Sequence, residues 1–429
     1  MTNLEYINII GKIILGINMA TATPTKSTTV STEQGQYRFA FIAMTFLFFF
    51  WGFITVLNDI LIPHLKAAFD LNYTQAMLVQ FCFFGAYFII SPFAGRLIDK
   101  IGYQRGIVFG LLTTASGCIL FYPSAELEVY ALFLFAFFVL ASGITILQVA
   151  ANPYVSALGS VKTAASRLTL AQALNSLGTT IGPILGAMLI LNAATADAST
   201  VQMPYLFIAG MLITAAIIFY KIKLPVLAHL QTDKKVNTDS IWQHKSLLLG
   251  ALAIFLYVGG EVSIGSFLVN YFTESSIAGM TEAEAGTMVA FYWGAAMAGR
   301  FLGAVLMNYF SATRYLALNS FVAIAMIVVS MNTMGDIAMW SILAVGFFNG
   351  IMFPTIFALA IRGLGSLTNK GSGILCQAIV GGALVPVIQG VAADLWGIQF
   401  SFVIPLLCYI YIGWYALNSV EKNTEIPIQ

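Results

Sequence analysis

Charged residues are scarce along this chain. Only 9% of its 429 residues are Asp, Glu, Lys or Arg, whereas 59% are hydrophobic and the mean hydropathy is +0.88. A soluble domain needs more charge than this, because about a quarter of a typical globular sequence is charged. The composition therefore excludes a soluble protein and indicates that most of the surface faces lipid.

The sequence also lacks the motifs of the common enzyme classes. Its four cysteines lie in apolar runs without a CxxC spacing, so neither a disulfide framework nor a zinc site is predicted. It has no Walker loop, GxSxG elbow, HExxH helix or basic aromatic stripe. We therefore expect no enzyme, no cofactor and no nucleic-acid partner, and an ion or solute gradient as the energy source.

Long apolar runs are abundant. They are continuous over about 20 residues, which is the length of a helix that crosses a hydrocarbon core roughly 30 Å thick. We expect twelve such spans in two sets of six, near residues 39–64, 73–98, 107–122, 129–158, 164–191 and 204–220, then 247–272, 283–310, 315–331, 337–364, 371–395 and 400–417.

One long hydrophilic connection separates the two sets. The predicted organisation is an N-terminal bundle at 38–222, a cytoplasmic linker at 223–245 and a C-terminal bundle at 246–418, with cytoplasmic tails at 1–37 and 419–429. The first tail is rich in Thr, Ser and Gln over 21–36, a composition typical of disorder. Either Met1 or Met19 could be the first residue of the native protein.

Positive charges lie almost entirely on one side of this topology. Of the 19 Lys and Arg residues, Lys66 falls on the other side and Arg300 lies within span eight, while the rest occupy the termini or the loops after even spans. Such loops are cytoplasmic by the positive-inside rule. The bias predicts that both termini are cytoplasmic and places the protein in the cell inner membrane.

The two halves resemble each other at an offset of roughly 200 residues. Gly95 and Gly303 correspond in the second span of each half, and Pro153 and Pro354 in the fourth. A parallel repeat of this kind places a cavity between the halves near the middle of the membrane. The predicted fold is all-α and integral to the membrane, with two pseudo-symmetric six-helix bundles.

Two carboxylates lie inside apolar spans. Asp59 follows Asn58 toward the outer end of span one, and Glu261 lies in the corresponding span seven. A charged group near the bilayer centre costs about 2.5–3.5 kcal/mol on insertion scales, so such residues are usually functional. The alternative is that Asp59 lies at an interfacial helix end or pairs with Arg300.

Amides form a polar stripe on spans four and five. Gln148 and Asn152 are four residues apart, and Gln172 and Asn175 three apart, so each pair shares a helix face. Amides and carboxylates suit sugar hydroxyls, and an aromatic ring can stack on a sugar face. The candidate sugar-binding set also includes Asn58, Gln80, Glu261, Asn349, Gln377 and the aromatic residues Trp51, Tyr292 and Trp293. The alternative is that the amides only join helices.

The loop after span two resembles a signature of the major facilitator superfamily. It reads GRLIDKIGYQR over 95–105, and the resemblance implies a cytoplasmic gate. A carboxylate at a helix end can pair with basic residues in one state and release them in another. The candidate gate residues are Gly95, Asp99, Lys100, Gly102 and Arg105, and the alternative is a charge cluster that only sets topology.

Four further segments resemble the fucose permease and glucose/galactose transporter branch of that superfamily. They are VLNDILIP at 56–63, AANP at 150–153, QALNSLG at 172–178 and FPTIF at 353–357. The resemblance implies a sugar:cation symporter that works by alternating access. It also implies that Asp59 is the essential helix-one aspartate and that Asn175 is linked to the substrate.

Position 148 departs from the fucose permeases, which carry a glutamate there. Gln148 cannot carry a proton, so the similarity to the glucose/galactose members is the closer one. Either Asp59 alone accepts a proton, or it binds Na⁺ together with oxygens of Gln148, Asn152 and Asn175, since Na⁺ prefers oxygen ligands. The sequence slightly favours Na⁺.

Together these features predict a monomeric importer of a hexose, either glucose/galactose or a fucose-like sugar, coupled to Na⁺ or H⁺. Two alternatives stay open. One is an exporter of small apolar compounds, and the other is a membrane sensor that binds sugar without transporting it.

Overall fold

The computed structural model describes residues 29–69, 73–186, 201–225 and 240–420. Within these ranges the chain is helical and has no β-strand. Continuous helices are expected, because backbone polar groups in a bilayer must be satisfied within the chain. Eleven of the described helical segments are long and apolar enough to cross a membrane.

The N-terminal half contains six long helices, α2 (Thr29–Ala68), α3 (Tyr73–Ile101), α4 (Tyr103–Glu126), α5 (Tyr130–Ala157), α6 (Ala164–Gly186) and α7 (Gln202–Lys221), with the 3-10 turn η1 (Val161–Thr163) before α6. The helix α6 is the one without a place among the eleven apolar segments. Its sequence carries Gln172, Asn175 and several hydroxyl residues, and its position against α2 makes it the twelfth span.

The C-terminal half repeats this plan with shorter pieces. They are η4 (Ile241–Gln243), α9 (Lys245–Thr273), α10 (Glu282–Leu306), α11 (Ala312–Asn332), α12 (Gly335–Asn349), α13 (Met352–Ala360), η5 (Gly365–Leu367), α14 (Thr368–Gln377), η6 (Ala378–Val380), α15 (Gly381–Trp396), α16 (Ile398–Ser401) and α17 (Val403–Val420). The tenth and eleventh spans are each built from two α-helices in series.

The break in the tenth span has a local cause. Pro354 lacks a backbone N–H and its ring would clash with the carbonyl of Gly350 in a continuous helix. The helix α12 therefore ends at Asn349, and α13 begins at Met352 with Pro354 in its first turn. The sequence predicts one continuous span over 337–364. The structure divides it into α12 and α13, an interruption that hydropathy does not reveal.

Several predicted boundaries shift. The helix α2 begins at Thr29, so residues 29–37 of the predicted disordered tail are helical. Residues 1–28, most of the linker, the end of span five beyond residue 186 and residues 421–429 lie outside the described ranges. The capping box of Thr281 and Glu284 defines the start of α10, close to the predicted boundary.

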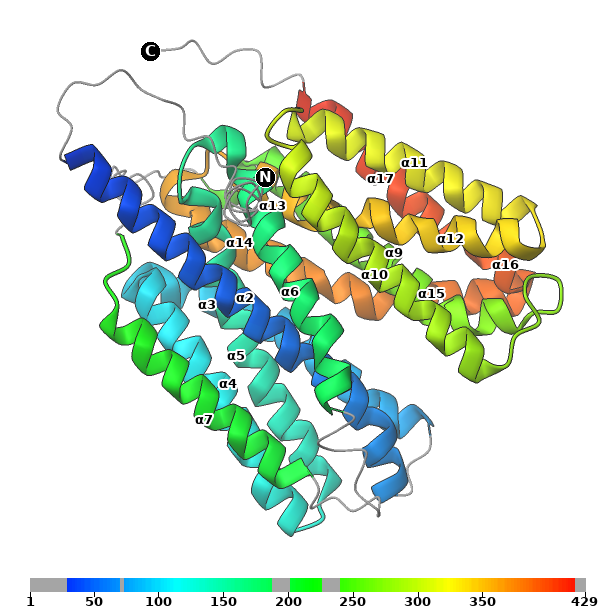
Figure 1. Cartoon of the computed structure of the whole chain (residues 1–429), viewed down its shortest axis with the longest axis horizontal. Helices are drawn as coiled ribbons and strands as arrows, with labels where there is room; N and C mark the ends of the chain where they lie inside the picture. Colours follow the sequence, from blue (N-terminus) through cyan, green and yellow to red (C-terminus); the bar gives the residue numbers. More distant parts are fainter. Residues whose placement is uncertain (1–28, 70–72, 187–200, 226–239, 421–429) are drawn as a thin grey trace, which may run out of the picture.

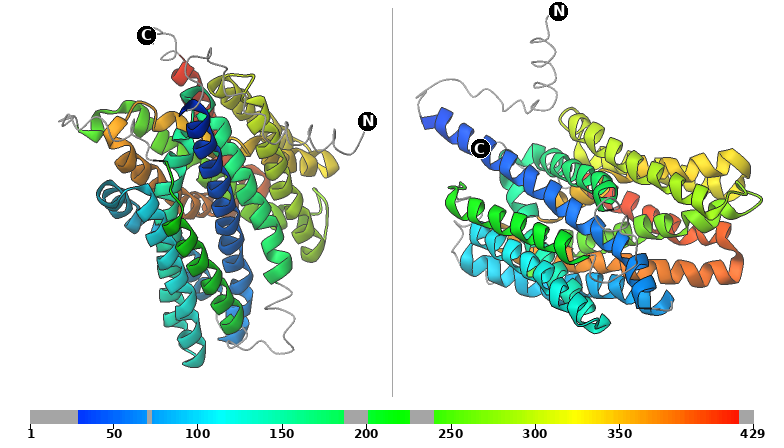
Figure 2. Two further views of the ribbon diagram at one scale, coloured as in Figure 1. Left: turned by 60° about the vertical axis from the view of Figure 1, so that its left-hand side comes forward. Right: turned by 60° about the horizontal axis from the view of Figure 1, so that its bottom comes forward.

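The two bundles lie side by side at one end and diverge toward the other (Figures 1 and 2). We call the end at which α3 meets α4 the basic end, because the loops there carry most Lys and Arg residues, and the opposite end the acidic end. Between the bundles, α3 packs on α14, and α6 packs on α10 and α13. These interhelix contacts frame the central cavity.

Candidate functional site

A cavity of 170 Å³ lies between the two halves. Both bundles contribute to it, with α2, α3, α5 and α6 on one side and α9, α10, α13 and η6 on the other. Its lining residues are Trp51, Thr55, Tyr87, Gln148, Gln172, Asn175, Thr179, Tyr257, Val258, Glu261, Arg300, Phe353, Pro354 and Ile379. The volume lies below the 300–1,000 Å³ usual for drug-sized ligands, which suits a small molecule.

Three of the predicted amides line this cavity. Gln148 donates a hydrogen bond of 2.8 Å from its Nε2 to the hydroxyl of Tyr87, and Asn175 donates one of 2.9 Å to the Phe48 carbonyl. Gln172 also faces the cavity. The protein thus fixes two of the amides. Gln148 Oε1 accepts a 4.0 Å contact from the Cys376 thiol, and Asn175 Oδ1 stays available to a ligand.

Aromatic rings and hydroxyls complete the N-terminal wall. Trp51 is 5% exposed and lines the cavity one helical turn before Thr55. Tyr87 lies on α3, where its hydroxyl accepts the hydrogen bond from Gln148. The indole offers a flat apolar face of the kind that packs on a sugar ring, next to groups that can bond hydroxyls.

The C-terminal wall contains an ion pair. Arg300 Nη2 lies 3.6 Å from Glu261 Oε1, and both side chains are largely buried. Arg300 Nε also donates a hydrogen bond of 3.2 Å to the Gly350 carbonyl, at the break in the tenth span. In addition, its Nη1 donates to Ser176 Oγ on α6, so this side chain connects the two halves beside the cavity.

Tyr292 and Asn349 lie behind the cavity wall. Asn349 Nδ2 donates a hydrogen bond of 2.7 Å to the hydroxyl of Tyr292. This hydroxyl donates one of 3.2 Å to the backbone carbonyl of Glu261. The Tyr257 hydroxyl donates 3.0 Å to the Asn349 carbonyl. Both predicted residues are fully buried and support the Glu261 segment without lining the cavity.

Three other candidates lie away from the cavity. Asn152 is fully buried one turn below Gln148 toward the basic end, and its amide has no partner. Trp293 is 42% exposed and packs against Gly265 on α9. Gln377 is half-buried at the end of α14. In this conformation the structure therefore does not gather these residues with Gln148 and Asn175.

Asn58, Asp59 and Gln80 lie in described helices, but their side chains are outside the described part of the structure. The backbone fixes one relation: position 59 follows the cavity residue Thr55 by four residues on α2. Residues four apart share a helix face. Position 59 is therefore one turn closer to the acidic end on the face that lines the cavity.

The predicted gate residues divide between two sides of α3. Asp99 accepts a 2.7 Å hydrogen bond from Asn369 Nδ2 on α14, and a Cβ atom at Gly95 would lie 2.8 Å from the Asn369 carbonyl oxygen. Lys100 and Arg105 are exposed, while Gly102 forms the turn to α4 with φ 81°. Asp99 and Gly95 thus belong to the contact between the halves.

Two further polar contacts close the basic end. Ser372 Oγ donates 2.9 Å to the Val149 carbonyl, and Ser166 Oγ donates 2.6 Å to the Ala304 carbonyl. Both bonds join one half to the other below the cavity. In this conformation the described contacts separate the cavity from the basic end.

Comparison with known proteins agrees with this architecture. The sequence profile of the Major Facilitator Superfamily matches residues 39–376. The chain belongs to this superfamily. The glucose/galactose transporter of Brucella abortus is 57% identical over 410 residues, which cover 93% of this chain and 99% of that protein. The L-fucose-proton symporter of Escherichia coli is 34% identical, with coverage of 92% and 97%.

Solved structures give the same result. The crystal structure of a Major Facilitator Superfamily transporter in the outward conformation superposes with a TM-score of 0.83 at 32% identity, and the match covers 90% of this chain and 99% of that one. The twelve-span fold predicted from hydropathy is therefore confirmed. Members of this superfamily are membrane transporters, which also agrees with the prediction that the chain is not an enzyme.

Sequence reasoning missed several cavity residues of this superfamily member. Tyr87 and Tyr257 gave no signal, because buried tyrosines are common in apolar helices. Arg300 was recognised as the arginine inside span eight, and the sequence offered Asp59 as its alternative partner. The structure pairs it with Glu261. Which span faces which cannot be read from one helix at a time.

Proposed function

We propose that this protein is a sugar:proton symporter that carries a hexose of the glucose/galactose type across the inner membrane by alternating access. The observation that carries the proposal is the cavity between the halves, in which three amides, an indole and an ion pair converge. Its closed side is the basic end, for which we propose a cytoplasmic location with both termini, and we propose that a monomer suffices.

The chemistry of the lining supports a neutral polyol as substrate. Each sugar hydroxyl both donates and accepts, and the amides of Gln148, Gln172 and Asn175 offer both functions. The ion pair of Glu261 and Arg300 contributes charges of both signs, so the described lining has no excess charge that would favour an anion. The name of the Brucella relative gives the same substrate class.

Alternating access follows from the two-bundle plan. In the present state the halves touch at the basic end through Asp99, Asn369, Ser372 and Val149. Rocking of one bundle against the other would break these contacts and open the cavity to the basic side. The thermodynamic role of the coupled ion is to favour sugar binding, and sugar and ion must strengthen each other's binding equally.

A proton explains the ion coupling better than Na⁺. The expected Na⁺ ligands are Asp59, Gln148, Asn152 and Asn175, but Asn152 does not line the cavity, so the described structure does not bring this set together. A single carboxylate at position 59 can still accept a proton. The relative from Escherichia coli, 34% identical, is named as a proton symporter.

Uptake of labelled glucose and galactose into proteoliposomes tests the proposal. We expect accumulation above the external concentration when the outside is acidic, and only equilibration without a gradient. Accumulation driven by a Na⁺ gradient alone would show that the coupled ion is Na⁺ and that the protein is still a symporter. Accumulation that is equal with and without gradients would exclude coupling.

The same vesicles address the two alternatives. Binding of labelled glucose without counterflow would identify a sensor. Efflux of small apolar dyes without any sugar flux would identify an exporter. Exchange of labelled for unlabelled glucose in the absence of gradients is the result that we expect from a transporter.

A further inference from the structure

A second hollow, of 460 Å³, lies on the outside of the N-terminal bundle near the basic end. The helices α3 and α4 are joined only through Gly102, yet both pack mainly on α5 and little on each other. They therefore leave a groove whose floor is α5. We call this the α3–α4 groove, and its lining residues are Ile90, Phe93, Ala94, Arg96, Leu97, Lys100, Phe109 and Ile146.

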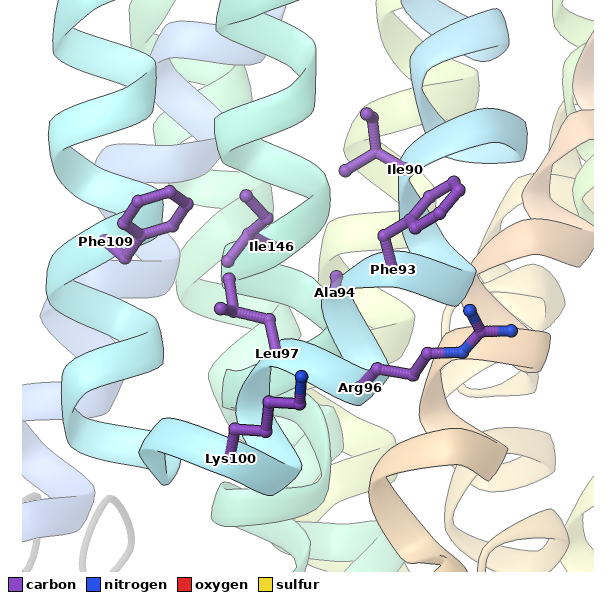
Figure 3. Close-up of a pocket in the computed structure, with 8 residues that line it drawn as sticks. All are labelled: Ile90, Phe93, Ala94, Arg96, Leu97, Lys100, Phe109 and Ile146. Carbon is purple, nitrogen blue, oxygen red and sulfur yellow. The ribbon is translucent and has the colours of Figure 1, made fainter.

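The groove combines an apolar trough with a basic end. Figure 3 shows apolar side chains of α3 and Phe109 of α4 on its two sides, with Ile146 of α5 between them. Lys100 lies at one end, and Arg96 extends from the same end of α3 away from Phe109. Phe93 is 60% and Phe109 47% exposed, although Ile146 beneath them is 5% exposed. Nothing in the described part of the protein covers these rings.

Its length matches one leaflet of a bilayer. Ile90 and Lys100 are ten residues apart on α3, which corresponds to about 15 Å along a helix that rises 1.5 Å per residue. Half of a hydrocarbon core roughly 30 Å thick is the same length. An acyl chain lying against Ile90, Phe93 and Leu97 would thus bring its headgroup to the level of Lys100.

Charge separates across α3 in a way that favours an anionic headgroup. Arg96 and Lys100 are one turn apart and line the groove, and the Arg96 guanidinium lies 5.9 Å from the Phe93 ring centre. Asp99, between them in sequence, is turned to the other half and bonded by Asn369. The groove lining contains two cations and no carboxylate.

We propose that the α3–α4 groove is a binding site for an anionic phospholipid of the leaflet at the basic end. Its acyl chain lies on the apolar trough, and its phosphate bonds to Arg96 and Lys100 by charge-assisted hydrogen bonds. The opposite face of α3 makes the contact between the halves through Gly95 and Asp99. A lipid in this site therefore contacts the same helix that closes the cavity.

Native mass spectrometry of the full-length protein, extracted from vesicles of equal phosphatidylglycerol and phosphatidylethanolamine, tests the site. We expect the retained lipid to be enriched at least fivefold in phosphatidylglycerol. The variant Arg96→Gln/Lys100→Gln should reduce this enrichment to less than twofold. The matched variant Lys245→Gln/Arg314→Gln removes two exposed basic residues outside the groove and should keep the enrichment.

A second variant separates the groove from its charges. Leu97→Trp fills the trough and keeps both basic residues, so it should also lower phosphatidylglycerol retention at least threefold. If size-exclusion chromatography shows that Arg96→Gln/Lys100→Gln does not fold, Leu97→Trp alone still tests the site. Absence of enrichment in the wild type, equal loss in the groove and control variants, or full retention in Leu97→Trp would each overturn the proposal.

Discussion

At the scale of single residues, Arg300 connects three segments that surround the central cavity. It pairs with Glu261 on α9, bonds the Gly350 carbonyl at the break between α12 and α13, and reaches Ser176 in the other half. A buried pair is costly to break from one side, because the remaining charge loses its partner. Arg300 therefore ties the chemistry of the cavity to the contact between the halves.

Asp59 carries the energy coupling in our account. Asp59→Asn removes the ionisable group but keeps size and polarity, so we expect accumulation in a pH gradient to be lost while counterflow of labelled glucose persists. Asp336→Asn, in the first turn of α12 at the acidic end, is the matched control and should accumulate normally. An unchanged accumulation ratio in Asp59→Asn would remove this residue from the coupling mechanism.

Gln148 contributes to sugar affinity through a fixed amide. Gln148→Ala removes the bond to Tyr87 and a group that faces the sugar, at a cost of about 1 kcal/mol per lost hydrogen bond, or a roughly fivefold to tenfold higher KM for glucose. Gln104→Ala removes an amide that bonds the Phe219 and Ile222 carbonyls outside the cavity, and should leave KM within twofold. Initial rates of uptake measure both, and equal KM values for the two variants would contradict this role.

The sequence could indicate such residues only in part. Gln148 and Asn152 share a helix face, and periodicity treats them alike, yet Asn152 is fully buried and only Gln148 lines the cavity. Asn349 and Tyr292 had the right chemistry for a site, but they bond to each other behind its wall. Interhelix packing decides these cases, and a single sequence carries no direct record of it.

At the scale of helices, close packing of α2 on α6 builds the N-terminal wall. Gly178 lies so close to α2 that a Cβ atom there would be 2.2 Å from the Phe49 carbonyl oxygen, and one at Gly52 would be 2.1 Å from the Asn175 carbonyl oxygen. Gly178, Gly182 and Gly186 stand four residues apart, a spacing typical of closely packed helices. The described contacts at Gly178 agree with such packing.

Gly178→Ala tests this helix contact. The added methyl group would force α2 and α6 apart, and overpacking of this kind costs about 1–3 kcal/mol of the free energy of unfolding. Gly85→Ala on α3 is the control, since a Cβ atom there meets nothing within 4 Å. Thermal unfolding in detergent should show a clear loss for Gly178→Ala only, and an equal midpoint for both variants would contradict the packing argument.

Helix boundaries were less predictable than helix number. Hydropathy marks twelve spans because the bilayer demands an apolar length, which is a local property of sequence. The interruptions at Gly350 and at η6 lie in equally apolar stretches. Phe353, Pro354 and Ile379 line the cavity at these interruptions, so the features that shape the site were those that hydropathy could not show.

At the scale of the whole molecule, the contacts at the basic end define the present state. A disulfide between Asp99→Cys and Asn369→Cys, made in a background with Cys82 replaced by serine, should hold the halves closed there. We expect oxidation to stop glucose uptake and a reductant to restore it, because the cavity could no longer open to the basic side.

The control pair is Lys100→Cys with Asn369→Cys. Lys100 lines the groove on the outer side of the bundle, so this pair should not cross-link. Gel mobility reports the cross-link and vesicle uptake reports the function. Full uptake by protein that is cross-linked between positions 99 and 369 would contradict alternating access at this contact.

The central claim is that the hexose occupies the cavity between the halves, and protection of a cysteine at position 179 tests it most directly. Thr179→Cys places a thiol in the cavity, and Met203→Cys places one on the 72% exposed surface of α7. Reaction with an impermeant maleimide is followed with and without saturating glucose, again with Cys82 replaced by serine. We predict that glucose slows labelling at 179 at least fivefold and leaves 203 unchanged, whereas equal labelling rates at 179 in a variant that still transports glucose would contradict the account.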